Sequence, residues 1–226
     1  MQYRALVDLR WWVWVVLSVC VASPVAAVDG LPPVEAHVPW TLEQRHDDPT
    51  LGYSLYKRIL PGSEYAAYRL EGELDAPPDE VVRAARANLV DTDVQQARIS
   101  KEILRDDGDV VIVHSHIDMP PLIRDRDVTT RSQRFFDPET RSYRLEWRAT
   151  DEGPPPRDGV IRMQRSDGGW VFAPLEGGRT RVTYESHVEL AGSLPAWLVN
   201  SMMNETVVDS FEELRARVES NRSGGS

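Results

Sequence analysis

"TRVTYESHVEL", residues 180–190, alternates strictly between two kinds of side chain. One set is apolar or small and comprises Val182, Tyr184, Ser186, Val188 and Leu190. The other set is polar and comprises Arg181, Thr183, Glu185, His187 and Glu189. Successive side chains of a β-strand point to opposite faces, so a period of two predicts a strand with one buried face and one face in water.

The same alternation recurs earlier in the chain, at residues 63–74, "SEYAAYRLEGEL", and 142–149, "SYRLEWRA". The apolar sets are Ala66, Tyr68, Leu70, Gly72 and Leu74 in the first stretch, and Tyr143, Leu145, Trp147 and Ala149 in the second. Strands with one wet face are typical of antiparallel sheets. The segments "DPETRS" (137–142), "SDGG" (166–169) and "EGG" (176–178) have the composition of turns between such strands.

Two helices are predicted around these strands. Residues 76–90, "APPDEVVRAARANLV", begin with prolines and acids and carry an apolar stripe of Val81, Val82, Ala85 and Leu89. The second helix is predicted over 194–220, with a stripe of Leu194, Leu198, Met202, Val207 or Val208, Phe211, Leu214 and Val218. The sheet has to bury its apolar face, and this long helix is available to cover it. The sequence therefore predicts an α+β fold, with a curved antiparallel sheet wrapped around the C-terminal helix and an apolar cavity suited to a lipid.

Composition and charge exclude some classes of function. The chain has 226 residues and a net charge of −10, and its isoelectric point is near 5.0. A nucleic-acid-binding protein needs a basic surface to offset phosphate charge, so we expect no nucleic-acid partner. We expect the domain to act as a monomer.

The N-terminus has the features of an export signal. Arg4 and Arg10 precede an apolar run over residues 11–21, which is shorter than the ~20 residues that span a bilayer. We predict a signal peptide over 1–27 with cleavage after Ala27, a proline-rich linker over 28–39, a domain over 40–222 and a disordered tail over 223–226. A retained membrane anchor and a lipidated Cys20 are the competing interpretations. Cleavage would remove Cys20, the one cysteine, and leave a domain without disulfides.

Several segments, in this order, resemble the START domain family, the lipid-transfer domains related to the steroidogenic acute regulatory protein. They are Trp40, "GYSLYKRILPGSEYAAYRLEGELDAPPDEV" (52–81), "DMPPLIRDRDV" (118–128), Trp170 and "PLEGGRTRVTYESHVELAGSLPAWLVN" (174–200). The resemblance implies a helix-grip fold with an internal tunnel for one sterol, phospholipid or similar lipid. It also implies that the protein has no catalytic activity, needs no cofactor and contacts membranes transiently. With the export signal, it implies a periplasmic protein.

The resemblance and the strand faces together give a set of candidate ligand-binding residues. They are Tyr68, Val113, Ser115, Ile117, Met119, Leu122, Arg131, Leu145, Trp147, Tyr184, Ser186, Leu198 and Met202. The resemblance implies that Arg131 meets a polar group inside the tunnel, although neither face of residues 128–136 is plainly apolar. It also implies that the loop over Met119–Ile123 acts as a gate.

Two histidines lie beside the gate, in "DVVIVHSHI" (109–117). Val111, Val113, Ser115 and Ile117 form the better inner wall, so His114 and His116 are predicted to point outward, or into a shell between the sheet and outer segments. A zinc site would need a third or fourth ligand, so we expect no metal. We expect both histidines to be dispensable for ligand binding.

Two alternatives to a lipid carrier remain open. One is an enzyme on the same fold, similar to the aromatase and cyclase relatives, which would use groups such as Arg131, Ser115 and Tyr184. The sequence has no G-x-S-x-G segment and no glycine-rich phosphate loop to support other chemistry. The second alternative is a module that docks on a membrane or a partner protein through residues 120–123.

Overall fold

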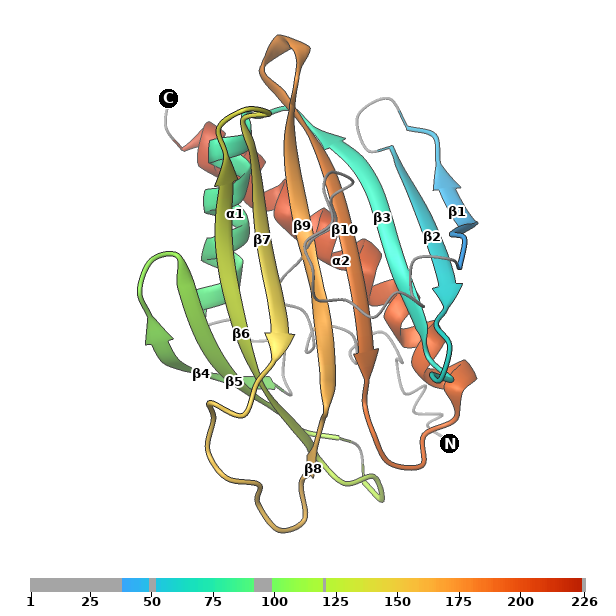
Figure 1. Ribbon diagram of the computed structural model, residues 1–226. Coiled ribbons are helices and arrows are strands. Elements are labelled where there is room, and N and C mark those ends of the chain that lie inside the picture. Colours follow the sequence, from blue (N-terminus) through green and yellow to red (C-terminus); the bar gives the residue numbers. More distant parts are fainter. Residues whose placement is uncertain (1–37, 49–51, 92–98, 120, 225–226) are drawn as a thin grey trace, which may run out of the picture.

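An open antiparallel sheet and two helices make up the computed structural model, which describes residues 38–48, 52–91, 99–119 and 121–224 (Figure 1). The elements, in chain order, are β1 (Thr41–His46), β2 (Tyr53–Ile59), β3 (Ala66–Leu74), α1 (Pro78–Val90), β4 (Ile99–Asp106), β5 (Val110–Ile117), β6 (Arg126–Asp137), β7 (Ser142–Ala149), β8 (Ile161–Arg162), β9 (Arg165–Leu175), the short 3-10 helix η3 (Glu176–Gly178), β10 (Arg179–Glu189) and α2 (Ala196–Ser223). The predicted signal peptide lies outside the described residues.

The strands are ordered β1-β2-β3-β10-β9-β7-β6-β5-β4, and the two-residue strand β8 pairs with the start of β6. The pairing is antiparallel throughout except between β6 and β8. β10, the last strand in sequence, therefore lies between β3 and β9 rather than at an edge. The sheet, with a long C-terminal helix across one face, confirms the predicted fold class (Figure 1).

The predicted strand alternation is present in the structure. Val182, Tyr184, Ser186 and Val188 of β10 are buried on the face that meets the helices, which we call the inner face. The cross-strand register extends this face into β3, β9, β7, β6 and β5. Burial of these apolar side chains is the main source of stability for a domain of this kind.

Both helices cover the inner face. α1 packs against β7 and β9, α2 packs against β3 and β10, and the two helices contact each other. In α2 the buried stripe runs through Val199, Met203, Val207, Phe211, Leu214 and Val218. The predicted stripe, which passed through Leu198 and Met202, is wrong by one residue in this half of the helix. A step of five residues from Met202 to Val207 exceeds the 3.6-residue period, whereas Met203 and Val199 follow in steps of four.

α2 lies very close to the sheet where Phe211 packs over Gly72 of β3. A Cβ atom at Gly72 would lie 2.5 Å from Phe211 Cζ, well inside carbon–carbon contact distance. Phe211 has no exposed surface, and its ring meets Tyr53 of β2 edge-on at a centroid distance of 6.3 Å. The missing side chain of Gly72 thus sets how near the helix lies to the strands.

One predicted turn is absent. The segment 166–169 continues β9, whereas residues 137–142 and 176–178 do form the predicted connections. The reason is the Trp147 indole, which lies over Gly168: a Cβ there would be 2.5 Å from Trp147 Cη2 and 2.4 Å from the Glu185 carbonyl oxygen. Gly168 is thus required for close packing inside a strand rather than for a turn.

Candidate functional site

Most of the predicted ligand-binding residues lie together on the inner face. Those that are buried there are Tyr68 on β3, Val113, Ser115 and Ile117 on β5, Leu145 and Trp147 on β7, and Tyr184 and Ser186 on β10. The prediction that these side chains face inward is confirmed by the structure. Leu198 and Met202 are half-buried, beside the main stripe of α2.

Aromatic side chains form a layer at the centre of this face. Trp170 of β9 stacks on Tyr184 with a centroid distance of 4.3 Å and on Phe172 at 5.9 Å. Trp147 also stacks on Tyr184, with a centroid distance of 6.4 Å. Such rings bury a large apolar surface while keeping few rotatable bonds, so they form a rigid apolar wall.

The N-terminal turns of α2 are held against β3 by neutral hydrogen bonds. Tyr68 donates its hydroxyl proton to the Asn200 carbonyl oxygen at 2.8 Å, and the Ala66 amide donates to Asn200 Oδ1 at 2.8 Å. Burial raises the pKa of Tyr68 to about 12. Asn200 was missed by the sequence reasoning, because its partners lie more than a hundred residues away in the chain.

The expectation that Arg131 points inward is wrong. Arg131 pairs across the strands with Ile112 and Arg148, on the face opposite the core. Its guanidinium lies 3.3 Å from Glu152 Oε1, and the side chain is half-exposed. The inward position belongs to the next residue, Ser132, which is 1 % exposed.

A hydrogen bond joins the two ends of the loop that was predicted to act as a gate. Asp125 Oδ1 accepts a hydrogen bond from the Met119 amide at 2.8 Å. Met119 packs against the core, whereas Leu122 is fully exposed and adopts a φ of 79°. Left-handed backbone is unfavourable for a leucine, so this conformation is maintained by the closure around it. Pro120 lies outside the described residues.

Arg126 and Asp127, at the start of β6, have structural roles. Arg126 is buried and donates hydrogen bonds from Nε to the Leu190 carbonyl at 3.3 Å and from Nη2 to the Ala191 carbonyl at 3.1 Å. These bonds place the gate loop next to the segment that leads into α2. Both segments lie at the same end of the molecule (Figure 1).

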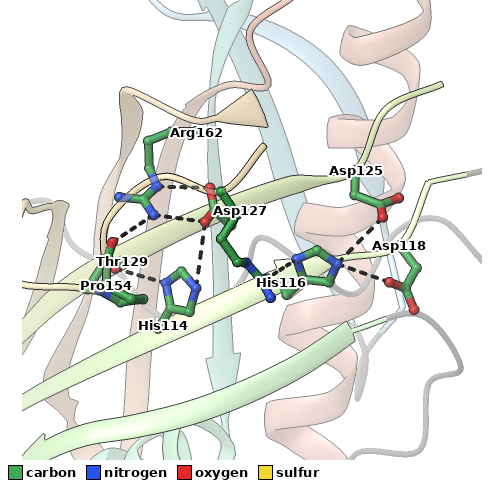
Figure 2. A network of polar contacts seen from close by, with 9 residues as sticks. His114, His116, Asp118, Asp125, Asp127, Thr129, Pro154 and Arg162 are labelled. Carbon is green, nitrogen blue, oxygen red and sulfur yellow. Dashed lines mark hydrogen bonds and ion pairs between the residues drawn. The ribbon is translucent and has the colours of Figure 1, made fainter. Parts of the chain in front are cut away.

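His114 lies in a closed polar network on the outer face (Figure 2). Asp127 accepts two hydrogen bonds from Arg162, both at 2.8 Å, and His114 Nδ1 lies 3.0 Å from Thr129 Oγ1. The bonds from Arg162 hold the pKa of Asp127 below its usual range, and burial lowers the pKa of His114. The network fixes residues 150–164, which we call the strap, to β6, and the strap covers His114. This is the shell between sheet and outer segment that the sequence allowed for.

His116 lies between the ends of the gate. Its Nε2 is 3.2 Å from Asp118 and 3.6 Å from Asp125, a spacing that a metal ion could bridge. However, Arg157 of the strap lies 2.8 Å from His116 Nδ1, and a guanidinium can only donate. Nδ1 is therefore the acceptor, and Nε2, which Figure 2 shows on the side of the two carboxylates, carries the proton. In this arrangement the Nε2 proton of His116 faces the Asp118 and Asp125 carboxylates, so Nε2 offers no lone pair to a metal ion.

The helices in the described part of the chain offer no candidate for a membrane span, because none is both long and apolar enough. α2 is long, but it carries charged side chains at intervals along its length.

Comparison with known proteins gives sequence relatives. An uncharacterized protein of Pseudomonas aeruginosa is 28% identical over 186 residues, which cover 80% of this chain and 87% of that protein. The mitochondrial steroidogenic acute regulatory protein of Rattus norvegicus is 27% identical over 191 residues, which cover 80% of this chain but only 64% of the rat protein. This chain thus spans less than two thirds of the rat protein.

Solved structures share the fold. A STAR-related lipid transfer protein from Xanthomonas axonopodis superposes with a TM-score of 0.66 at 24% identity, covering 80% of this chain and 98% of that chain. Human StAR-related lipid transfer protein 5 gives a TM-score of 0.62 at 19% identity, covering 81% of this chain and 88% of that chain. The START domain family model matches residues 34–224. The chain therefore belongs to the START domain family.

Proposed function

We propose that this protein binds one sterol, phospholipid or similar lipid between the inner face of the sheet and α2, and that it carries or senses the ligand without changing it chemically. The observation that carries the proposal is the inner face itself, where Trp147, Trp170 and Tyr184 form one apolar wall on the side that the two helices cover. A lipid binds to such a wall through burial of its own apolar surface. The family membership supports the same assignment.

Native mass spectrometry tests this proposal. The protein is purified, delipidated, exposed to a total lipid extract and weighed under non-denaturing conditions. We expect a one-to-one complex whose ligand has the same mass before and after binding. Arg131→Ala serves as the outer-face control and should bind as the parent does. Failure of any lipid to bind would contradict the proposal, and a change in the mass of the bound molecule would favour a cyclase-like enzyme instead.

The end of the molecule that carries the gate is proposed as the membrane-contacting surface. Leu122 is fully exposed there, and Trp197 at the start of α2 is 72% exposed. Exposed leucine and tryptophan side chains gain free energy by entering the interface of a bilayer. Because Arg126 joins the gate loop to the segment before α2, both side chains could reach one membrane together.

Sedimentation with phosphatidylcholine vesicles tests the surface. We expect Leu122→Ser and Trp197→Ser each to reduce the vesicle-bound fraction several-fold, because each removes about 2 kcal/mol of apolar transfer energy. Phe136→Ser is the matched control, since Phe136 is also an exposed hydrophobic residue, at the β6–β7 hairpin away from the gate. Equal loss in all three variants would contradict a specific surface.

We further propose that the protein acts as a monomer outside the cytoplasm after removal of residues 1–27. The support is the sequence of the N-terminal segment, with its basic start and short apolar run. Cell fractionation followed by intact-mass measurement tests this. A mature chain that begins at Val28 is expected, and recovery of the full-length chain from the membrane would favour an anchor instead.

A further inference from the structure

Three buried polar side chains lie in one row across the inner face. Ser132 of β6 is directly opposite Trp147 of β7, Trp147 is opposite Gly168 of β9, and Gly168 is opposite Ser186 of β10. Ser132, Trp147 and Ser186 are each 1 % exposed. The Trp147 ring lies over Gly168, so it fills the gap between the two serines. The row is thus a continuous strip of four strands with a polar atom on three of them.

None of the three polar atoms in this row has a hydrogen-bond partner among the residues that the structure describes. They are Ser132 Oγ, Trp147 Nε1 and Ser186 Oγ, and solvent does not reach them. A buried donor without a partner is costly, and folded proteins rarely keep one without a reason. Three such atoms in one row therefore indicate a group that is supplied from outside the chain.

Three other buried hydroxyls of the described residues have partners, whereas Ser166 of β9, two residues from Gly168, has none. Thr180 of β10 donates to the Ala76 carbonyl at 2.6 Å, and Ser210 of α2 donates to the Thr206 carbonyl at 2.9 Å. The hydroxyl of Tyr68, directly opposite Ser186, is bonded to Asn200. The packing of this domain can therefore satisfy buried hydroxyls, as it does for Thr180, Ser210 and Tyr68.

The surroundings of the row decide the charge of the missing group. Among the described inward-facing residues of β6, β7, β9 and β10, the charged ones are Arg126 and Arg134. Arg126, six residues from Ser132, donates to the main-chain carbonyls of Leu190 and Ala191, and Arg134 is paired with Asp109 at 2.6 Å and is partly exposed. A phosphate or carboxylate beside Trp147 would therefore be buried without a counter-charge, which is strongly unfavourable. A neutral ligand oxygen, in contrast, can be satisfied by this row. The indole N–H of Trp147 can donate to it, and each serine hydroxyl can donate or accept.

We infer that Ser132, Trp147 and Ser186 form the subsite for the polar end of the ligand, and that this end is a neutral oxygen, a hydroxyl or a carbonyl, on a long apolar body. The inference rests on the proposed function and specifies its ligand class: an uncharged lipid rather than one with an ionised head group buried in the core. The oxygen accepts from Trp147 Nε1 and exchanges hydrogen bonds with the two serine hydroxyls. Because these atoms are covered in the closed structure, the ligand reaches them when the covering side chains move aside.

Four probes with one chain length test the subsite: dodecane, dodecanol, dodecanoate and dodecyl phosphate, each measured by displacement of a solvatochromic dye. We expect dodecanol to bind at least tenfold more tightly than the two anions. Ser132→Ala and Ser186→Ala should each weaken dodecanol binding by about two- to tenfold, the range for one neutral hydrogen bond. Neither variant should change the binding of dodecane, which has no oxygen. Trp147→Phe keeps the aromatic ring and should act in the same direction.

The outcomes separate the inference from the proposed function. Equal binding of dodecanol by the parent and both serine variants would overturn the subsite, as would anions that bind as tightly as dodecanol, while the lipid-binding function would stand. Displacement by none of the four probes, dodecane included, would overturn the function and the subsite together. Arg131→Ala, one residue away on the outer face, is the matched control and should behave as the parent.

Discussion

Replacing Gly72 by alanine tests whether the contact between α2 and the sheet is as close as the structure has it. The new Cβ would lie 2.5 Å from Phe211 Cζ and 3.0 and 3.1 Å from the two Cε atoms. Carbon atoms in contact are normally about 3.5 to 4 Å apart, so the ring has to retreat by ~1 Å. Phe211 is fully buried and packs on Tyr53, so no free space receives it. Overpacking of this kind costs about 1 to 3 kcal/mol.

Urea unfolding, followed by tryptophan fluorescence and by far-UV circular dichroism, measures the cost. We expect the free energy of unfolding to fall by about 1 to 3 kcal/mol, which corresponds to a melting temperature lower by about 2 to 10 °C for a domain of this size. Phe211→Leu alone should also destabilise, but in the Gly72→Ala background it should cost much less, because the smaller side chain leaves room for the new methyl group. Strict additivity of the two substitutions, or an unchanged stability of Gly72→Ala, would refute the close contact.

Three other substitutions have defined expected outcomes. Asp127→Asn leaves Arg162 without its buried partner, so urea unfolding at pH 7 should show a free energy of unfolding lower by about 3 to 5 kcal/mol. The pKa of Asp127 is lowered in the folded state, so the parent should lose this contribution as the pH falls below about 4. The pKa of His114 is also lowered in the folded state, so the parent should lose stability as the pH falls below about 6.5, and His114→Gln should flatten this dependence and keep dodecanol binding. Ser186→Ala should leave the stability of the ligand-free protein unchanged or slightly higher, whereas Thr180→Val, which breaks the bond to Ala76, should lower it by about 1 kcal/mol in the same unfolding assay. A loss for Ser186→Ala as large as that for Thr180→Val would contradict the absence of a partner for Ser186 among the described residues.

The strands with a clean alternation were predictable from the sequence. In residues 180–190 a hydrophobic or small residue occupies every second position. The other face is in contact with water and carries polar residues, so the alternation can be recognised in the sequence. β6 lacks this pattern, because its first half is covered on both sides. Thr129 is buried beneath the strap, and Thr130 is buried on the inner face. Because neither face of this first half is open to water, its sequence carries no alternation from which the inward position could be extended to Arg131 or Ser132.

Contacts between distant segments also escaped prediction. Arg162 could not be assigned to Asp127 from the sequence, because β8 is only two residues long and has no periodicity of its own. The turn predicted at residues 166–169 failed for a related reason. Its glycines match turn chemistry locally, but Gly168 is selected by the Trp147 ring from another strand. Tertiary packing overrides local propensity at such positions.

The central position of β10 has a consequence for how the domain is made. Arg69 and Glu185 face each other across β3 and β10 although 116 residues separate them in the chain. To form this strand pair, the chain has to close a long loop and lose conformational entropy before the strands make any contact. Folding steps of this kind are slow. While the chain is being synthesised, β1, β2 and β3 can form only a separate meander whose inner edge is open. The sheet becomes continuous after the last strand is available, so a nascent chain that ends before residue 189 has two incomplete half-sheets and no domain.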